Sequence, residues 1–251
     1  MTNVIIHGIA GKMGQALDRI ISETEDINIA AGIDKVSVEA TYPVFTDISE
    51  CDVPADVIID FSIAAAVPAI IEYAEKKKLP LVLCTTGLSD ETLAMVAKAS
   101  KTIPILRSAN MSLGINLLID LVKQAAEVLF ASDFDIEIVE KHHNQKADAP
   151  SGTALAIADA INETLDNKLG YIYDRTGRRQ ARDKYEMGIH AIRGGTIPGD
   201  HDVIFAGKNE IVEINHKALS RDIFAVGAVK AAVFLKGKAP GMYSMNDVIK
   251  A

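Results

Sequence analysis

The feature that most constrains the fold is an alternation of short apolar runs with segments of helical periodicity along the first hundred or so residues. The apolar runs are Val4–His7, Ile27–Ile33, Val57–Phe61, Leu81–Cys84 and Ile103–Leu106. The helical segments between them are Met13–Ser22, Ala64–Lys77 and Asp90–Ser100. Strands that are apolar at successive positions have both faces covered, as in a parallel sheet between two layers of helices. The pattern therefore predicts an α/β domain with a doubly wound, Rossmann-like parallel sheet.

Three glycines follow the first strand, at Gly8, Gly11 and Gly14. Glycine lets the backbone turn sharply and approach phosphate oxygens closely, and the helix that starts near Lys12 directs its free N–H groups toward an anion. A tight turn without any ligand would show the same triplet. Asp34 at the end of the next strand favours a dinucleotide site instead, because a carboxylate at this position accepts hydrogen bonds from an adenosine ribose. We therefore predict a dinucleotide-binding turn.

Further cofactor contacts are expected where other strands end, since ligands of open parallel sheets bind at the carboxyl ends of the strands. Lys35 directly follows Asp34. It is either an ordinary surface lysine or a partner for a 2′-phosphate, and the Asp–Lys pair predicts use of both NADH and NADPH. The predicted cofactor-binding residues are Gly8, Ile9, Ala10, Gly11, Lys12, Met13, Asp34, Lys35, Cys84, Thr85, Thr86, Ser108, Ala109, Asn110 and Met111.

The pattern changes after residue 111. A long amphipathic helix is predicted over Ser112–Ala131, followed by an alternating, half-exposed strand over Phe134–Lys141 and a helix over Ser151–Leu165. Further strands are expected at Gly188–Arg193, Asp202–Ala206 and Glu210–Lys217. Helices on one side of a mixed sheet indicate an α+β domain with an open sheet face, and an open face is a natural oligomer surface.

The helical stretch Asp222–Leu235 is alanine-rich and apolar, so we expect it to pack back on the first domain. The predicted organisation is a dinucleotide-binding domain formed by residues 1–111 and 220–251. Residues 112–219 then form a domain for substrate binding and oligomerisation. The strands of this second domain carry alternating apolar residues, Val203 and Phe205 in one and Ile211 and Ile214 in the next, so an open sheet face is expected.

The stretch 140–154 reads E-K-H-H-N-Q-K-A-D-A-P-S-G-T-A and combines proton donors with a helix start. Histidine titrates near neutral pH and lysine is a cation that can pair with a carboxylate or donate a proton. If the preceding strand continues through His142 and His143, they point to opposite faces; in a loop both could face a cleft. Ser151 is a predicted helix cap, which leaves the amides of Gly152 and Thr153 as donors for a carboxylate. The alternative is a polar loop whose histidines are incidental.

Composition and charge exclude several classes of protein. A net charge of −8 argues against general nucleic-acid binding, and no apolar run reaches the 18 residues of a membrane span. The chain enters a strand almost at once, so we expect a cytoplasmic protein that is not exported. Neither Cys51 and Cys84 nor the histidines have a metal-ligand spacing, so no metal is predicted. The basic cluster Arg175–Lys184 indicates a solvated loop or, less strongly, a loop beside an anionic site.

The stretch 140–154 closely resembles the signature of the dihydrodipicolinate reductase family, which is roughly E-x-H-H-x-x-K-x-D-x-P-S-G-T-A. The segments G-I-A-G-K-M-G, C-T-T-G, S-A-N-M-S-L-G-I-N and H-K-A-L-S-R also resemble the family in their order, so the resemblance covers essentially the whole chain. Two departures are small: Cys84 replaces the first glycine of the family's G-T-T-G, and Asp34–Lys35 stands where some members have Glu–Arg.

The resemblance implies an NAD(P)H-dependent oxidoreductase of lysine and diaminopimelate biosynthesis. It reduces a cyclic unsaturated dicarboxylate to tetrahydrodipicolinate, with loss of water from the 4-hydroxy substrate, and acts as a homotetramer built through the open sheet. It also implies His142 as proton donor and acceptor and Lys146 as proton donor. The substrate-binding residues implied are His143, Ser151, Gly152, Thr153, Thr86 and Arg221. Two alternatives stay open: another small-substrate reductase of the same fold, and a catalytically silent NAD(P)-binding sensor.

Overall fold

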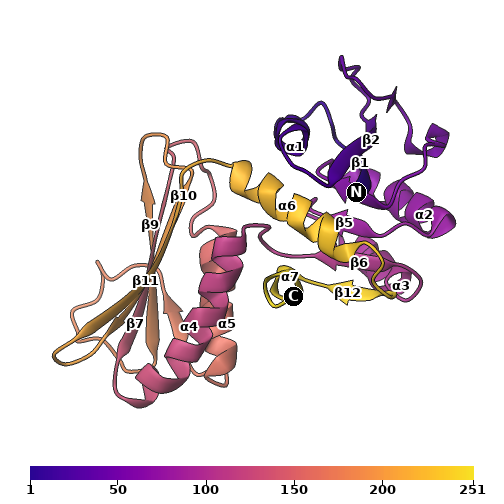
Figure 1. The fold of residues 1–251 in the computed structure, drawn as a ribbon. Helices are drawn as coiled ribbons and strands as arrows, with labels where there is room; N and C mark the ends of the chain where they lie inside the picture. Colours follow the sequence, from indigo (N-terminus) through magenta and orange to yellow (C-terminus); the bar gives the residue numbers. More distant parts are fainter. The chain divides into compact units, whose positions relative to one another are not determined.

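The computed structural model describes all residues 1–251, and the chain folds into two compact units (Figure 1). The first unit contains Met1–Leu113 and Asp222–Ala251, and the second contains Gly114–Arg221. No helix combines the length and apolarity needed to span a bilayer.

The first unit is a seven-stranded sheet in the order β12-β6-β5-β4-β1-β2-β3, and every neighbouring pair is parallel. The strands are β1 (Thr2–His7), β2 (Ile27–Ile33), β3 (Val44–Phe45), β4 (Val57–Asp60), β5 (Leu81–Leu83), β6 (Pro104–Arg107) and β12 (Gly241–Tyr243). The helices are α1 (Lys12–Ser22), α2 (Val67–Lys77), α3 (Asp90–Ala99), α6 (Asp222–Leu235) and α7 (Met245–Ile249), with 3₁₀ turns at Ile48–Glu50 and Ala64–Ala66.

Two layers of helices cover this sheet because successive strand residues point to opposite faces. In β1, Val4 and Ile6 pack in a core with α1 and α6, whereas Ile5 packs in the other core with α2 and α3. The order of strands reverses at β1, since β2 and β4 lie on its two sides. Such a switch point opens a crevice at the carboxyl ends of the strands, where ligands of this fold bind.

The second unit is a mixed five-stranded sheet in the order β11-β10-β7-β9-β8. Its strands are β7 (Asp135–His142), β8 (Gly170–Ile172), β9 (Glu186–Arg193), β10 (Gly199–Ala206) and β11 (Ile211–Ala218). The helices α4 (Leu113–Ala131) and α5 (Gly152–Thr164) pack on one face and form one apolar core with it. The predicted fold class is therefore confirmed: a doubly wound parallel sheet and an α+β unit with a mixed sheet.

The structure also corrects the sequence analysis. The short strands β3, β8 and β12 and the helix α7 were not predicted, because two to five residues carry too little periodicity to be recognised. On β11, Ile211 is 63% exposed, while Val212 and Ile214 pack against the core, because the period of a strand is two residues.

The basic segment Arg175–Lys184 is a largely exposed loop, as predicted, and several of its arginines pair with carboxylates of the neighbouring strands. Arg182 donates to Glu137 at 2.9 Å and to Asp135 at 2.7 Å, both on β7. Arg175 pairs with Glu186 of β9 at 2.7 Å. Three arginines of this segment, Arg175, Arg178 and Arg182, are therefore paired with carboxylates of β7 and β9.

Candidate functional site

The glycine turn after β1 leaves no room for side chains. Gly8 has φ +88°, and a Cβ there would lie 2.7 Å from the carbonyl oxygen of Phe61 at the end of β4. A Cβ on Gly14 would lie 2.2 Å from the carbonyl oxygen of Gly8. Gly11 caps α1 without any side-chain hydrogen bond, so the amides of the first turn of α1 point out of the helix end. The turn is therefore a cradle of backbone donors suited to phosphate oxygens.

Asp34 lies beside this turn, directly after β2. Its carboxylate accepts hydrogen bonds from the amide of Ala10 at 2.9 Å and of Val36 at 3.1 Å. A cavity of about 470 Å³ is lined by Gly8, Gly11, Asp34 and Lys35, among others. The structure thus brings together the glycine turn and the Asp–Lys pair that were expected to bind a dinucleotide.

The two other predicted cofactor loops do not line this cavity. Thr86 is exposed, but Thr85 is buried and donates to the carboxylate of Asp60 at 2.6 Å. Burial raises the pKa of the half-buried Cys84 thiol well above its ordinary value, so this thiol stays protonated. Met111 is buried in the core, with its carbonyl oxygen against Gly227 of α6. In these loops Thr85 and Met111, which were predicted to contact the cofactor, are buried and stabilise the fold.

In the second unit, β7 continues through His142, so the two adjacent histidines part. His142 is buried at 8% exposure on the side of the core, whereas His143 is half-buried and lines a surface cavity. The strand thus includes His142 but not His143, which is the first residue after β7. Two neighbouring imidazoles occupy different surroundings and cannot share one chemical task.

His142 is held by Glu140, two residues earlier on the same face of β7. The Nδ1 atom of His142 lies 2.6 Å from Oε2 of Glu140, which is completely buried. Arg193 of β9 binds both carboxylate oxygens of Glu140 at 2.7 Å. Burial raises the pKa of Glu140, but the hydrogen bonds from Arg193, His142 and the Ser151 amide outweigh it, so the pKa lies below its ordinary value. A carboxylate is therefore present at neutral pH beneath the histidine.

The predicted cap of α5 is present. The hydroxyl oxygen of Ser151 accepts from the amide of Ala154 at 3.1 Å, and the same oxygen lies 3.1 Å from Nε2 of His201 on β10. Gly152 and Thr153 begin the helix, and helix amides in this turn lack intrahelical acceptors. Burial, and after it the nearby His142, lower the pKa of His201 to about 4, against the opposing effect of Glu140. His201 is accordingly neutral at physiological pH.

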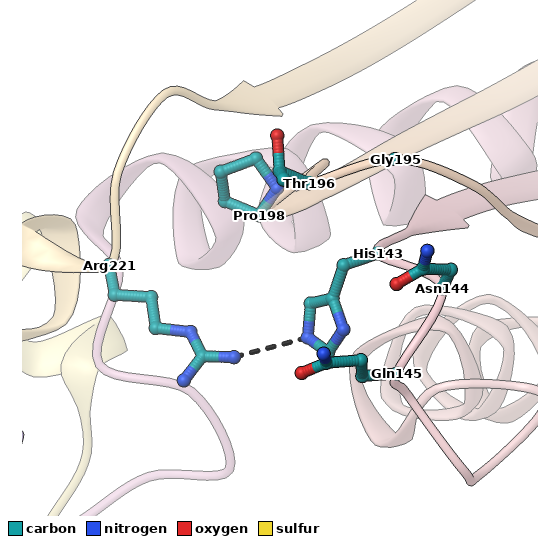
Figure 2. Close-up of a pocket in the computed structure, with 7 residues that line it drawn as sticks. All are labelled: His143, Asn144, Gln145, Gly195, Thr196, Pro198 and Arg221. Atoms are coloured by element: carbon teal, nitrogen blue, oxygen red, sulfur yellow. Dashed lines mark hydrogen bonds between the residues drawn. The ribbon is translucent and has the colours of Figure 1, made fainter.

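The cavity beside His143 has a volume of about 290 Å³ and is lined by His143, Asn144, Gln145, Gly195, Thr196, Pro198 and Arg221 (Figure 2). The guanidinium of Arg221 points at the imidazole of His143, and Nη2 of Arg221 lies 3.1 Å from Nε2 of His143. Because a guanidinium only donates, this imidazole nitrogen accepts. Desolvation, and then the charges of Arg221 and of neighbouring cations, lower the pKa of His143. In this open cavity a neutral His143 therefore accepts a hydrogen bond from the positively charged Arg221.

Lys146, the second predicted proton donor, does not line this cavity. Its ammonium group pairs with Asp148 at 2.8 Å, and its side chain is 21% exposed. Thr86, which the sequence analysis also placed near the substrate, belongs to the first unit. The structure therefore gathers His143 and Arg221 at one cavity and places His142 and Ser151 in a buried network with Glu140 and His201, while Gly152 at the start of α5 is exposed.

Comparisons with known proteins agree along the whole chain. Residues 2–111 match the model of the dihydrodipicolinate reductase N-terminus, and residues 114–249 match the model of its C-terminus. The chain belongs to the dihydrodipicolinate reductase family. It is 55% identical to the 4-hydroxy-tetrahydrodipicolinate reductase of Caldanaerobacter subterraneus subsp. tengcongensis, over 100% of this chain and 99% of that protein. It is 51% identical to the enzyme of the same name from Clostridium tetani, over 100% and 98%.

A solved structure supports the fold. It is the dipicolinate-bound dihydrodipicolinate reductase from Paenisporosarcina sp. TG-14, with a TM-score of 0.83 at 24% identity, covering 98% of this chain and 99% of that one. The predicted family and its activity as an NAD(P)H-dependent oxidoreductase are confirmed by family membership. The chain of this reductase therefore carries one Rossmann-like unit and one unit with the family's histidine segment.

Four residues of this reductase were missed by the sequence analysis: the buried Glu140, Asp60 and His201, and the half-buried Arg193. Glu140 stood inside the quoted segment, and a charged residue two positions before a histidine on an alternating strand was an available signal. Arg193 and His201 carried no such signal, because each comes from a distant strand. Only the pairing of β7 with β9 and β10 brings them to Glu140 and Ser151.

Proposed function

We propose that this reductase reduces 4-hydroxy-tetrahydrodipicolinate to tetrahydrodipicolinate, with NADH or NADPH as hydride donor. The observation that carries the proposal is the cavity in which Arg221 meets a neutral His143. The guanidinium of Arg221 is a cation, and a neutral His143 whose Nε2 accepts from it carries a proton on Nδ1 that it can donate. Both groups suit a ligand carboxylate. The cavity volume of about 290 Å³ suits a small ring with two carboxylates. The solved relative with bound dipicolinate, itself a cyclic dicarboxylate, supports the same class of ligand.

The first unit binds the cofactor in this proposal, and its residues fit a dinucleotide. The pyrophosphate occupies the space beside Gly8 and Gly14 that a Cβ would fill. The backbone amides of Lys12 and Met13 donate hydrogen bonds to it. Asp34 accepts from the adenosine ribose, and Lys35 faces a 2′-phosphate when NADPH binds. The remaining predicted contacts, Cys84–Thr86 and Ser108–Met111, belong to the same proposal. The nicotinamide supplies the hydride; the chain supplies binding and orientation.

The second unit binds the substrate and manages its protons. His143 and Arg221 hold one carboxylate, and the amides of Gly152 and Thr153 with the Ser151 cap hold the other. His142 gives its proton from Nε2, because Nδ1 is engaged with Glu140. Lys146 donates a proton after leaving Asp148, an exchange between partners that costs little at a half-exposed ion pair.

Assembly and location belong to the proposal as well. The sheet face opposite α4 and α5 bears Ile204 and Ile211 on its outer side, and pairing of such faces would build a homotetramer. Function in an amino-acid biosynthetic pathway places the enzyme in the cytoplasm.

A coupled assay tests the activity. The purified protein is mixed with freshly formed product of pyruvate and aspartate semialdehyde, made by the preceding synthase, and NADH absorbance is followed. The proposal requires oxidation of NADH that depends on both the protein and the synthase. Binding of NADH without any oxidation would instead support a silent dinucleotide sensor. Oxidation with another small keto acid but not with this substrate would support a different reductase.

A further inference from the structure

Glu140 occupies an unusual place in the second unit, because one buried carboxylate serves two different parts of the proposed site. Its Oε2 atom lies 2.6 Å from Nδ1 of His142. Its Oε1 atom accepts from the backbone amide of Ser151, the cap of α5, at 2.9 Å. The side chain is completely buried, so water does not compete for either hydrogen bond.

Arg193 locks this carboxylate in one orientation. It donates to both oxygens of Glu140 at 2.7 Å, and it also donates to the carbonyl oxygen of Asp148 at 2.6 Å. Asp148 in turn pairs with Lys146. The fork of the guanidinium therefore fixes Glu140 and, through Asp148, the loop that carries Lys146.

We propose that Glu140 is a positioning residue for catalysis: it keeps the proton of His142 on Nδ1, so that Nε2 faces the substrate side, and it fixes the first turn of α5. This inference rests on the proposed function, because it gives His142 the proton-transfer step. A carboxylate that is ionised and fully hydrogen-bonded can only accept, so the shared proton belongs to Nδ1 of the imidazole. Nε2 then exchanges the proton, and it lies beside the backbone of Gly199, where a Cβ would approach within 3.0 Å.

A plain structural ion pair is the competing reading, because a buried carboxylate and guanidinium are costly to separate in any protein. The chain offers a matched control in Glu186 at the other end of β9. Glu186 is also buried, at 8% exposure, and its carboxylate pairs with Arg175 and Arg178, away from His142. Loss of either carboxylate leaves an arginine unpaired, but only Glu140 touches the proposed proton donor.

The substitution Glu140→Gln separates the two tasks of the carboxylate. Each carboxylate oxygen accepts from one nitrogen of Arg193, but the Ser151 amide at Oε1 can only donate, whereas the imidazole at Oε2 can change its tautomer, so the glutamine oxygen takes the Oε1 position. The glutamine NH₂ then faces Nδ1 of His142 and forces the imidazole proton onto Nε2. We expect kcat to fall about 10–10²-fold, with the KM for substrate nearly unchanged because the α5 cap is kept. Glu140→Ala, which loses both contacts, raises this KM as well.

The tautomer of His142 is measured directly by ¹⁵N NMR of histidine-labelled full-length protein, with His142→Gln for assignment. In the unmodified protein the neutral imidazole of His142 carries its proton on Nδ1. Glu140→Gln moves this proton to Nε2 and shifts the limb of the kcat/KM pH profile that depends on His142 toward acid pH. Glu186→Gln lowers thermal stability but changes neither the tautomer of His142 nor the pH profile. A bare Nδ1 in the unmodified protein overturns the inference, even if Glu140→Gln fails to fold.

The double variant Glu140→Gln with His142→Gln separates this inference from the proposed function. If Glu140 acts through His142, the double variant is no slower than His142→Gln alone, since residues that act as a unit are not additive. A turnover lowered by the product of both single effects shows that Glu140 acts elsewhere and overturns the inference while the role of His142 stands. Full turnover of His142→Gln itself overturns the proposed function.

Discussion

The two candidate sites of this reductase are built from different material. In the first unit the site is made largely of backbone: Gly8 and Gly14 admit no Cβ, and α1 begins at a glycine that offers only main-chain groups. In the second unit it is made of side chains from several elements, with Glu140 and His142 on β7, Arg193 on β9 and His201 on β10. The difference teaches that a backbone site can be recognised from local glycine spacing, whereas a side-chain network depends on strand pairing.

The comparison predicts that the two sites fail in different ways, and the largest effect is expected at His142. The variant His142→Gln should lower kcat about 10²–10⁴-fold, because general acid catalysis is worth that much. Steady-state kinetics gives kcat, and fluorescence titration gives the affinity for NADH, which should stay unchanged since the cavity proposed for the cofactor lies in the first unit. A loss of NADH affinity would mean that His142 supports the fold, and the division between the sites would break.

His201 sharpens the comparison through pH. Its pKa is about 4 in the fold against an ordinary value of 6.5, so between these values the unfolded chain binds a proton that the folded protein does not. Stability is therefore complete above pH 6.5 and falls as the pH drops toward 4, by about 3 kcal/mol in all.

The variant His201→Gln, which keeps a partner for Ser151, should abolish this loss. Between pH 8 and pH 5 its free energy of unfolding should therefore fall by about 2 kcal/mol less than that of the unmodified protein. Urea unfolding at several pH values measures the difference, with pH 8 as the reference condition. Equal pH dependence in both proteins would show that His201 is not held neutral by burial.

The backbone site is tested by Gly8→Ala. The φ of +88° and the carbonyl oxygen of Phe61 at 2.7 Å oppose any side chain, and strain of about 1–3 kcal/mol should weaken NADH binding about tenfold or more. At saturating NADH, kcat should recover. Gly237→Ala is the matched control, because Gly237 has φ +77° but has open space around a Cβ. An equal loss of NADH affinity in the control would assign the effect to general strain.

The smallest effect is expected at Lys35, which lines the same cavity as Asp34. Lys35→Ala should raise the KM for NADPH several-fold, which corresponds to about 1 kcal/mol for one exposed charge pair, and leave the KM for NADH unchanged. Lys76→Ala on α2 provides a control lysine away from the cavity. If both cofactors respond alike, Lys35 does not face a 2′-phosphate.

Local signals in the sequence account for much of the fold. Strand β2 begins and ends where the apolar pattern predicts, at Ile27–Ile33, and so does helix α6, at Asp222–Leu235. The Ser151 cap is present as predicted, because a cap depends only on residues within one helical turn. The strand β12 was missed, since its three residues join the sheet only through pairing with β6, more than a hundred positions earlier.

The sequence by itself determined the family, the alternation of strands and helices, the glycine turn and the identity of the proton-bearing segment, because these depend on residues close together in the chain. Tertiary structure alone decided that His142 and His143 face apart, that Glu140 is an ionised and buried partner, and that Arg193 and His201 complete its surroundings. The physical reason is that burial and strand register set which charges meet, and both arise from pairings between β7, β9 and β10 that no local pattern records.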